Sequence, residues 1–196
     1  MIPESASDLD MIYENCWRML AIGAANRRSA LHQAVVATVD PDGAPETRTM
    51  VLRLIDRLER IAQFHTDRRA AKLDHLARDD RASLLFYDPG SRIQLRLGGR
   101  ISVHQDDPVA EAGWARTQAM SRVCYAAKIA PGAVIDAPDA ALEHLSAAER
   151  AGGYENFAVL RFRAQKMEWL SLAAAGHRRA RFTLAGSAPV GQWLAP

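Results

Sequence analysis

The stretch Arg48-Thr49-Met50-Val51-Leu52-Arg53 decides how this chain is interpreted. It is a run of residues that favour β-strands, opened and closed by arginine. Phe64-His65-Thr66 ends a second such run, Lys72 lies in the first turns of a helical pattern, and Gln94 interrupts an apolar strand pattern. Cations and hydroxyls at strand ends suit a phosphate, and a strand amide suits the polar edge of a ring. The pattern predicts a site for a phosphorylated, partly aromatic ligand.

Strand patterns joined by turn signals surround this stretch. The ranges 34–39 and 47–55 flank Asp40-Pro41-Asp42-Gly43, a turn signal that predicts a β-hairpin. Further strand patterns cover residues 60–66, 82–87, 92–97, 100–104, 156–162, 166–172 and 179–184. Helical patterns cover residues 5–31, 68–77, 108–119 and 139–150.

Polar residues and glycines mark several boundaries of these elements. Ser7 or Asp8 suits the N-cap of the first helix, Asp67 that of the second, and Asp106-Asp107 that of the third. Gly98-Gly99 divides one long strand pattern, which predicts a bulge or a sharp bend of the kind found at barrel corners.

The order of these elements predicts an α+β fold in a single domain spanning residues 1–196. Several short antiparallel strands with helices outside them favour a small β-barrel with peripheral helices. A parallel Rossmann sheet is disfavoured, because it requires a helix between successive strands and a glycine fingerprint that Gly98-Gly99 does not supply.

Composition and charge argue against several classes of function. The 196 residues are 48% hydrophobic and 24% charged, and the formal net charge of +2 does not indicate nucleic-acid binding. Cys16 and Cys124 form no disulfide framework and are expected to be buried free thiols. His65, His104 and His177 lack the spacing of metal ligands, so no metal site is predicted.

The sequence also bears on location. Residues Met1–Asp10 are acidic and contain no apolar core, so they do not predict a signal peptide. No apolar run approaches the length that spans a membrane. We therefore expect a cytoplasmic protein with neither a membrane nor a nucleic-acid partner.

The ordered motifs resemble those of the pyridoxamine 5′-phosphate oxidase-like family, whose fold is an FMN-binding split barrel. The resemblance runs from about residue 47 to the end of the chain. His65 stands where the family usually has tyrosine, and Ala71 replaces the first member of its cation pair. The matching positions are Arg48 through Arg53, His65-Thr66, Lys72, Gln94, Trp169, His177 and Arg179.

The resemblance implies a small antiparallel split β-barrel that binds FMN at the interface of a homodimer. Arg48, Thr66 and Lys72 would hold the phosphate and ribityl chain. Trp169 and Arg179 would reach the flavin ring from the partner subunit. The full set of predicted FMN-binding residues is Arg48, Met50, Val51, Arg53, His65, Thr66, Lys72, Gln94, Ser121, Arg122, Trp169 and Arg179. The same side chains also fit plainer roles, namely exposed strand ends, a surface helix lysine and a core tryptophan.

The departures from the family fall mainly on the substrate side. Ala175 stands where the true oxidases carry a substrate-binding arginine, and Arg178 replaces an aspartate between His177 and Arg179. The phosphate-gripping loop is rebuilt as residues 116–122. His177 remains a candidate substrate contact. We therefore expect a phosphorylated vitamer to be a poor substrate, because its charge-assisted contacts would be unmade.

Two functions follow from this interpretation. The first is an FMN-dependent oxidoreductase that moves hydride between a small substrate and the flavin. The alternative is a non-catalytic module that binds a flavin or haem, favoured by the altered substrate side.

Overall fold

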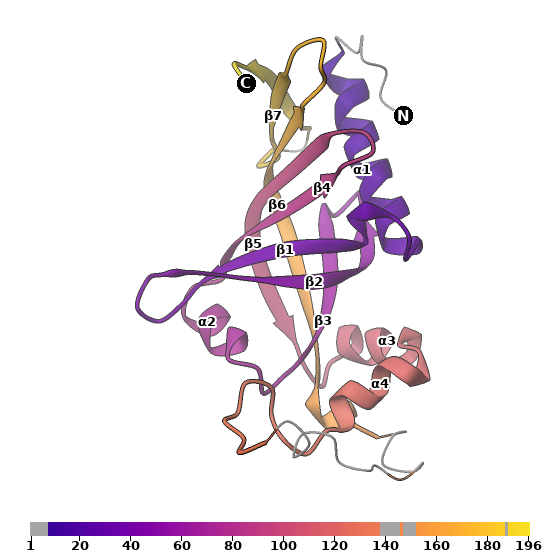
Figure 1. The fold of residues 1–196 in the computed structure, drawn as a ribbon, viewed down its shortest axis with the longest axis vertical. Helices are drawn as coiled ribbons and strands as arrows, with labels where there is room; N and C mark the ends of the chain where they lie inside the picture. Colours follow the sequence, from indigo (N-terminus) through magenta and orange to yellow (C-terminus); the bar gives the residue numbers. More distant parts are fainter. Residues whose placement is uncertain (1–7, 138–145, 147–151, 187) are drawn as a thin grey trace.

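The computed structural model describes residues 8–137, 146, 152–186 and 188–196, and its centre is a closed antiparallel barrel (Figure 1). The strands lie in the order β3-β2-β1-β4-β5-β6, and β6 pairs back with β3, which closes the barrel. The predicted α+β barrel is confirmed. The barrel strands are β1 (Gln33–Val39), β2 (Pro45–Asp56), β3 (Ile61–Asp67), β4 (Arg81–Asp88), β5 (Ile93–His104) and β6 (Phe157–Ser171).

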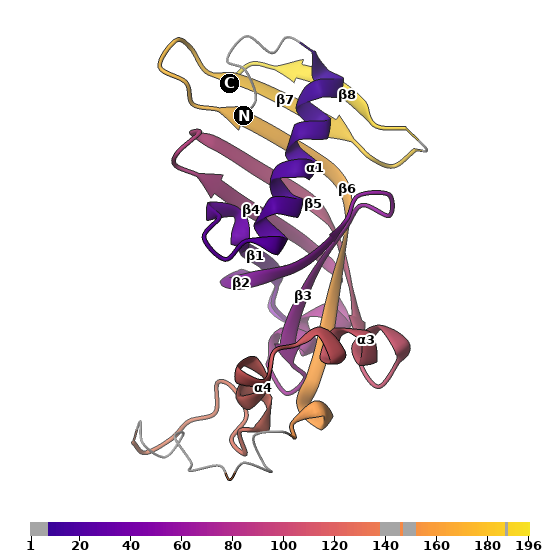
Figure 2. The ribbon, with the colours of Figure 1, turned by 90° about the vertical axis from the view of Figure 1, so that its right-hand side faces the viewer.

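Two further strands extend the sheet beyond the barrel. β7 (Arg178–Thr183) pairs with the second half of β6, and β8 (Val190–Leu194) pairs with β7. Figure 2 shows this extension at one end of the molecule, beside the start of α1 (Leu9–Ala25). β8 was not predicted, because its five residues include a glycine and show no alternation of buried and exposed side chains.

Strand alternation fills the barrel with apolar side chains. Successive residues of a strand point to opposite faces, so Leu52 and Phe64, both 0% exposed, face inward while their neighbours face outward. The largest fully buried side chains come from α1 and from strands β3, β4, β6 and β7, and they are Trp17, Phe64, Phe86, Phe157, Phe162, Trp169 and Phe182.

The first helix is shorter than its pattern predicted. Asp8 is its N-cap, with a side chain that accepts hydrogen bonds from the N–H groups of Asp10 and Met11. The helix ends at Ala25, not near residue 31, and the chain then forms the 3-10 turn η1 (Ala30–His32). The connection between α1 and η1 therefore lies outside regular helix.

The predicted turn and the predicted bulge are confirmed. The Asp40 carboxylate accepts hydrogen bonds from the N–H groups of Asp42 and Ala44, and Gly43 adopts a φ of 86°, so β1 and β2 form a hairpin. The β5–β6 register shifts between Gly98 and Gly99, so the glycines form a bulge within a continuous strand. A Cβ on Gly99 would lie 2.1 Å from the Arg163 carbonyl oxygen, which leaves room only for glycine.

Three short helices close or flank the barrel. α2 (Lys72–Arg78) buries Leu73 and Leu76 against the core. The predicted cap by Asp67 is wrong: Asp67 ends β3 and binds Arg69, and the residue before α2 makes no side-chain cap.

The pattern over 108–119 splits into α3 (Pro108–Arg116), capped by Asp107 as predicted, and α4 (Ala119–Ala126). A 3-10 turn, η3 (Tyr154–Asn156), leads into β6. The predicted helix over 139–150 lies, apart from residue 146, outside the described residues.

The prediction for the two cysteines is partly confirmed. Cys16 is buried as expected, but Cys124 is exposed on α4, so the prediction of two buried thiols is wrong for the second. In the described part of the chain, no group of three or more His, Cys, Asp or Glu residues could hold a metal ion. Within the same residues, no helix has both the length and the apolar character needed to cross a bilayer.

Candidate functional site

The first candidate site lies at the barrel end that α2 covers. Lys72, the first residue of α2, donates from Nζ to the Thr66 hydroxyl at 3.0 Å. Arg48 on β2 donates from Nη1 to the Thr38 hydroxyl at 2.6 Å, and from Nη2 to the Glu46 carboxylate at 3.0 Å. Strand alternation explains the arrangement, because Arg48 and Thr66 share the inward parity of Leu52 and Phe64 at the point where the core ends.

The charge of Arg48 affects Lys72. Burial lowers the pKa of Lys72, and the charge of Arg48 lowers it further, while Asp67 opposes the shift. Two cations and a hydroxyl that converge in a half-buried place match the donors that a phosphate group requires. An anion bound here would offset the repulsion and replace the hydration that the Lys72 ammonium has lost.

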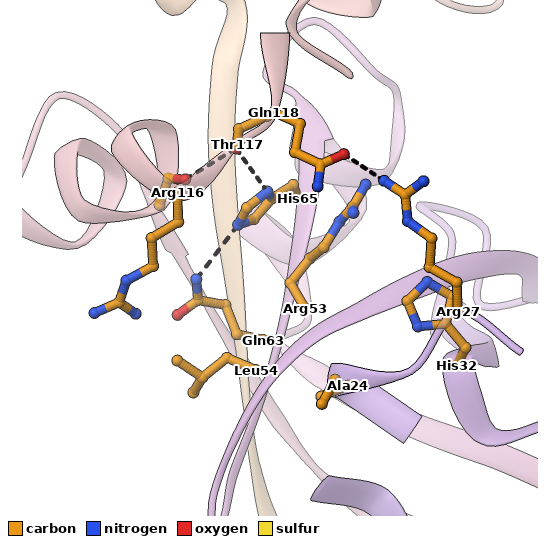
Figure 3. Close-up of a pocket in the computed structure, with 12 residues that line it drawn as sticks. Ala24, Arg27, His32, Arg53, Leu54, Gln63, His65, Arg116, Thr117 and Gln118 are labelled. Carbon is orange, nitrogen blue, oxygen red and sulfur yellow. Dashed lines mark hydrogen bonds between the residues drawn. The ribbon is translucent and has the colours of Figure 1, made fainter. Parts of the chain in front are cut away.

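The second candidate site is a pocket on the outer face of β2 and β3 (Figure 3). Arg53 and His65 lie next to core residues of their strands and therefore point to the opposite face. Side chains of α1, of the α1–η1 connection and of α3 and its C-terminal end complete the wall. The cavity measures about 200 Å³ and is lined by Ala24, Ala25, Arg27, His32, Arg53, Leu54, Gln63, His65, Gly113, Arg116, Thr117 and Gln118.

His65 is a neutral hydrogen-bonding group in this pocket. Burial lowers the pKa of its imidazole to about 4, and the nearby Arg53 charge adds to the effect. Its Nδ1 lies 3.3 Å from the Thr117 hydroxyl and its Nε2 lies 3.4 Å from the Gln63 amide nitrogen, while its ring packs edge-on against Phe157. These contacts fix the ring plane, so His65 can position a ligand but carries no charge at neutral pH.

The pocket is electropositive. Arg27, Arg53 and Arg116 line it, and the twelve lining residues include no carboxylate. The Nε of Arg53 is buried and has no hydrogen-bond partner among the described residues. A buried, unpaired donor on a cation is costly, so this guanidinium is suited to an anionic ligand.

The remaining predicted residues fall in three other places. Gln94 and Arg179 lie on the outer face across β5, β6 and β7, in register with Leu170 between them. Arg179 donates to Glu168 at 2.7 Å, and Arg96 and Arg181 contact the same carboxylate. Burial raises the pKa of Glu168, but the hydrogen bonds from Arg179 and Arg181 outweigh it, so the net pKa is lowered.

Two of the predicted residues belong to the core and others to the scaffold of the second pocket. Met50 is 8% exposed and Trp169 is 1% exposed, with Trp169 packed edge-on against Trp193. Val51 is half-buried on the outer face of β2. Arg122 donates to the carbonyls of Thr117 and Trp114 and thereby ties α4 to the end of α3, next to Ser121.

His177 is exposed in the loop before β7, beside the exposed Ala175. A single chain therefore does not gather the twelve predicted residues at one place. Arg48, Thr66 and Lys72 meet at the barrel end, and Arg53 meets His65 in the pocket. The positions on β5 to β7 lie on a different part of the outer surface.

Several pocket residues were missed by the sequence analysis. Gln63 could have been found, because it lies two residues before His65 and therefore shares its face. Thr117 and Gln118 fall within the predicted loop 116–122 but were not predicted as site residues, since the break between α3 and α4 was not predicted. Arg27 carries no local signal, because only the tertiary fold brings the residues after α1 next to α3.

Comparisons with known proteins agree with this architecture. The sequence profile of the family described as pyridoxamine 5′-phosphate oxidase matches residues 25–168. The pyridoxine/pyridoxamine 5′-phosphate oxidase 2 of Arabidopsis thaliana is 25% identical over 166 residues, which cover 80% of this chain and 83% of that protein. The enzyme of Thermobifida fusca is 41% identical over 76 residues, a match that covers 37% of this chain and 34% of that protein.

Solved structures show the same fold. A pyridoxamine 5′-phosphate oxidase-related, FMN-binding protein from Nostoc punctiforme superposes with a TM-score of 0.80 at 21% identity, covering 94% of this chain and 97% of that one. PhzG from Burkholderia lata, solved with tetrahydrophenazine-1-carboxylic acid, superposes with a TM-score of 0.73 at 20% identity, covering 100% and 98%.

The fold and the site together define an α+β split-barrel protein with a cationic cluster at one barrel end and an electropositive pocket on its outer face. The profile match covers most of the chain. This chain belongs to the pyridoxamine 5′-phosphate oxidase family, as its motifs predicted.

Proposed function

We propose that this protein is an FMN-dependent oxidoreductase that acts as a homodimer on a small anionic substrate. The observation that carries the proposal is the cluster of Arg48, Lys72 and Thr66 at the barrel end. Its donors match a phosphate, and the lowered pKa of Lys72 marks a place where an anion is favoured. An FMN-binding protein from Nostoc punctiforme with the same fold supports the choice of cofactor.

The chain's own residues would act mainly by binding and orientation. FMN, when bound, would supply the two-electron chemistry by accepting or donating hydride. Arg48, Lys72 and the Thr66 hydroxyl would hold its phosphate. Arg53 and the neutral His65 would face the substrate in the pocket on the outer face of β2 and β3, where their contacts and charge would select an anion. No described residue is required as a general base.

A homodimer accounts for the separated positions of the predicted residues. Gln94 and Arg179 lie on the outer face of β5 to β7, away from the barrel-end cluster of the same chain. In a two-fold dimer, the same surface of a second copy can supply these side chains to each site. Glu168 would then hold the Arg179 guanidinium in place, and a guanidinium near a reduced flavin stabilises its charge.

The proposal is tested by titrating cofactor-free protein with FMN. Arg48→Ala should weaken FMN binding by about 1.5–3 kcal/mol, the value of a hydrogen bond to a charged group. Binding of riboflavin, which lacks the phosphate, should change little. A wild-type protein that binds no FMN at micromolar concentrations would refute the proposed function outright.

A second candidate function is a module that binds a flavin or haem without turning over a substrate. The exposed loop around Ala175 and His177 favours it, because this segment has no cation at the position where true oxidases bind their substrate. Anaerobic reduction followed by exposure to oxygen or to other acceptors separates the two functions. A bound flavin that no reductant reduces and no acceptor reoxidises would support the non-catalytic binding module.

A further inference from the structure

One side chain of the electropositive pocket comes from a part of the chain that no predicted motif includes. Arg27 lies in the connection between α1 and η1, and it donates from Nη2 to the side-chain oxygen of Gln118, between α3 and α4. Figure 3 shows the groups of Arg27, Gln118 and Arg53 converging on one side of the pocket. The contact joins segments that are 91 residues apart in the sequence.

The partner of Arg27 is a neutral amide oxygen and not a carboxylate. Arg57 and Arg163, by contrast, pair with the carboxylates of Glu14 and Glu59. Gln118 offers only a neutral oxygen, and Arg53 has an unpaired, buried Nε. Gln118 is uncharged and His65, with a pKa lowered to about 4, is neutral, so neither side chain supplies a negative charge to the pocket. Two guanidinium groups at one wall thus have no counter-charge from the lining residues.

We propose that Arg27 and Arg53 together bind an oxyanion group of the substrate, a carboxylate or a phosphate, and that Arg27 determines the specificity for an anion. The inference rests on the proposed function in taking the ligand to be the substrate. The cavity of about 200 Å³ is below the roughly 300–1,000 Å³ of drug-sized sites, so it suits a small organic acid or one end of a larger ligand.

The geometry explains why Arg27 would distinguish an anionic ligand from a neutral one of the same shape. Guanidinium groups bind oxyanions in a planar, bidentate manner, and a bound oxyanion can replace the Gln118 oxygen as the acceptor for Arg27. Gln118 would then be free to donate its amide N–H to the same anion. A neutral ligand of the same shape would leave both cations without a counter-charge.

The test is calorimetric binding of three probes to wild-type protein, with and without FMN: benzoate, phenyl phosphate and the neutral benzamide. Wild-type protein should prefer at least one anion to benzamide, and the preferred anion identifies the group as carboxylate or phosphate. Arg27→Ala should raise the dissociation constant of that anion by about 10-fold. This is the lower end for a charge-assisted contact, because Arg27 is exposed. Benzamide and FMN binding should be unchanged.

Arg28→Ala is the matched control, because Arg28 is the adjacent exposed arginine and does not line the pocket. It should bind every probe like the wild type. The inference is overturned if wild-type protein shows no preference for either anion, if Arg27→Ala retains the preference, or if FMN binding falls by the same factor as anion binding. A protein that binds no FMN but loses its anion preference with Arg27→Ala would refute the proposed function and leave this inference standing.

Discussion

Replacing Lys72 by methionine should change cofactor binding and stability in opposite directions. Lys72 donates to Thr66 at 3.0 Å and lies close enough to Arg48 for that charge to lower its pKa. Methionine keeps the aliphatic length of the side chain but removes the charge and the donor. If the cluster holds the phosphate of FMN, loss of the charge-assisted contact should weaken FMN binding by about 1.5–3 kcal/mol, which raises the dissociation constant roughly 10- to 150-fold.

The cofactor-free protein should become more stable. The pKa of Lys72 is lower in the folded than in the unfolded chain, so folding disfavours its charged form at neutral pH. This penalty is fully present below the folded pKa and disappears as the pH rises through that value toward the ordinary value of lysine. Lys72→Met removes it, so the free energy of unfolding at pH 7 should rise and its increase with alkaline pH should diminish.

Two assays on the same preparations decide the matter. FMN titration followed by flavin fluorescence measures the dissociation constant, with riboflavin as the control ligand that lacks a phosphate. Urea unfolding of the cofactor-free proteins at pH 7 and pH 9.5 measures stability. An unchanged FMN constant together with reduced stability would show that Lys72 is a structural residue of α2, and the reasoning about a phosphate cluster would be wrong.

Four further outcomes are expected. Lowering the pH from 6.5 to 4 should destabilise the protein by up to roughly 3 kcal/mol through His65, because its pKa is about 4 when folded and the unfolded chain binds the proton more readily. His65→Gln should flatten that part of the pH profile of the free energy of unfolding, measured with denaturant. An unaltered profile would contradict the low pKa of His65. Gly99→Ala should cost at least about 2 kcal/mol by thermal or chemical unfolding, because its Cβ would meet the Arg163 carbonyl, and a wild-type stability would mean that the bulge relaxes freely. Light scattering should report a dimer, whereas a monomer with stoichiometric FMN would exclude a shared site. Pyridoxamine 5′-phosphate should be oxidised at well below ~1 per second, because Ala175 and the rebuilt loop at 116–122 lack the family's contacts to the substrate. Turnover within the ordinary enzymatic range would show that other cations replace these contacts.

Much of the fold could be predicted from the sequence, since its signals are local. The hairpin at Asp40–Gly43 follows from turn chemistry, in which a carboxylate binds backbone N–H groups and a glycine takes a positive φ. The bulge at Gly98-Gly99 follows from the same kind of argument. Helix ends were less predictable: Asp8 caps α1, but the Asp67 carboxylate is taken by Arg69.

The candidate site was also predictable only in part from the sequence. The sequence by itself determined the residue types, namely Arg48, Thr66 and Lys72 as donors for a phosphate. The register of β2 against β3, which pairs Leu52 with Phe64, placed Arg53 and His65 on one face. Only the tertiary structure decided that Trp169 is buried in the core and that Arg27 lies beside Gln118. The physical reason is range. Turn, cap and alternation signals act over a few residues, whereas burial and the meeting of Arg27 with Gln118 depend on how α1 and α3 pack on the closed barrel.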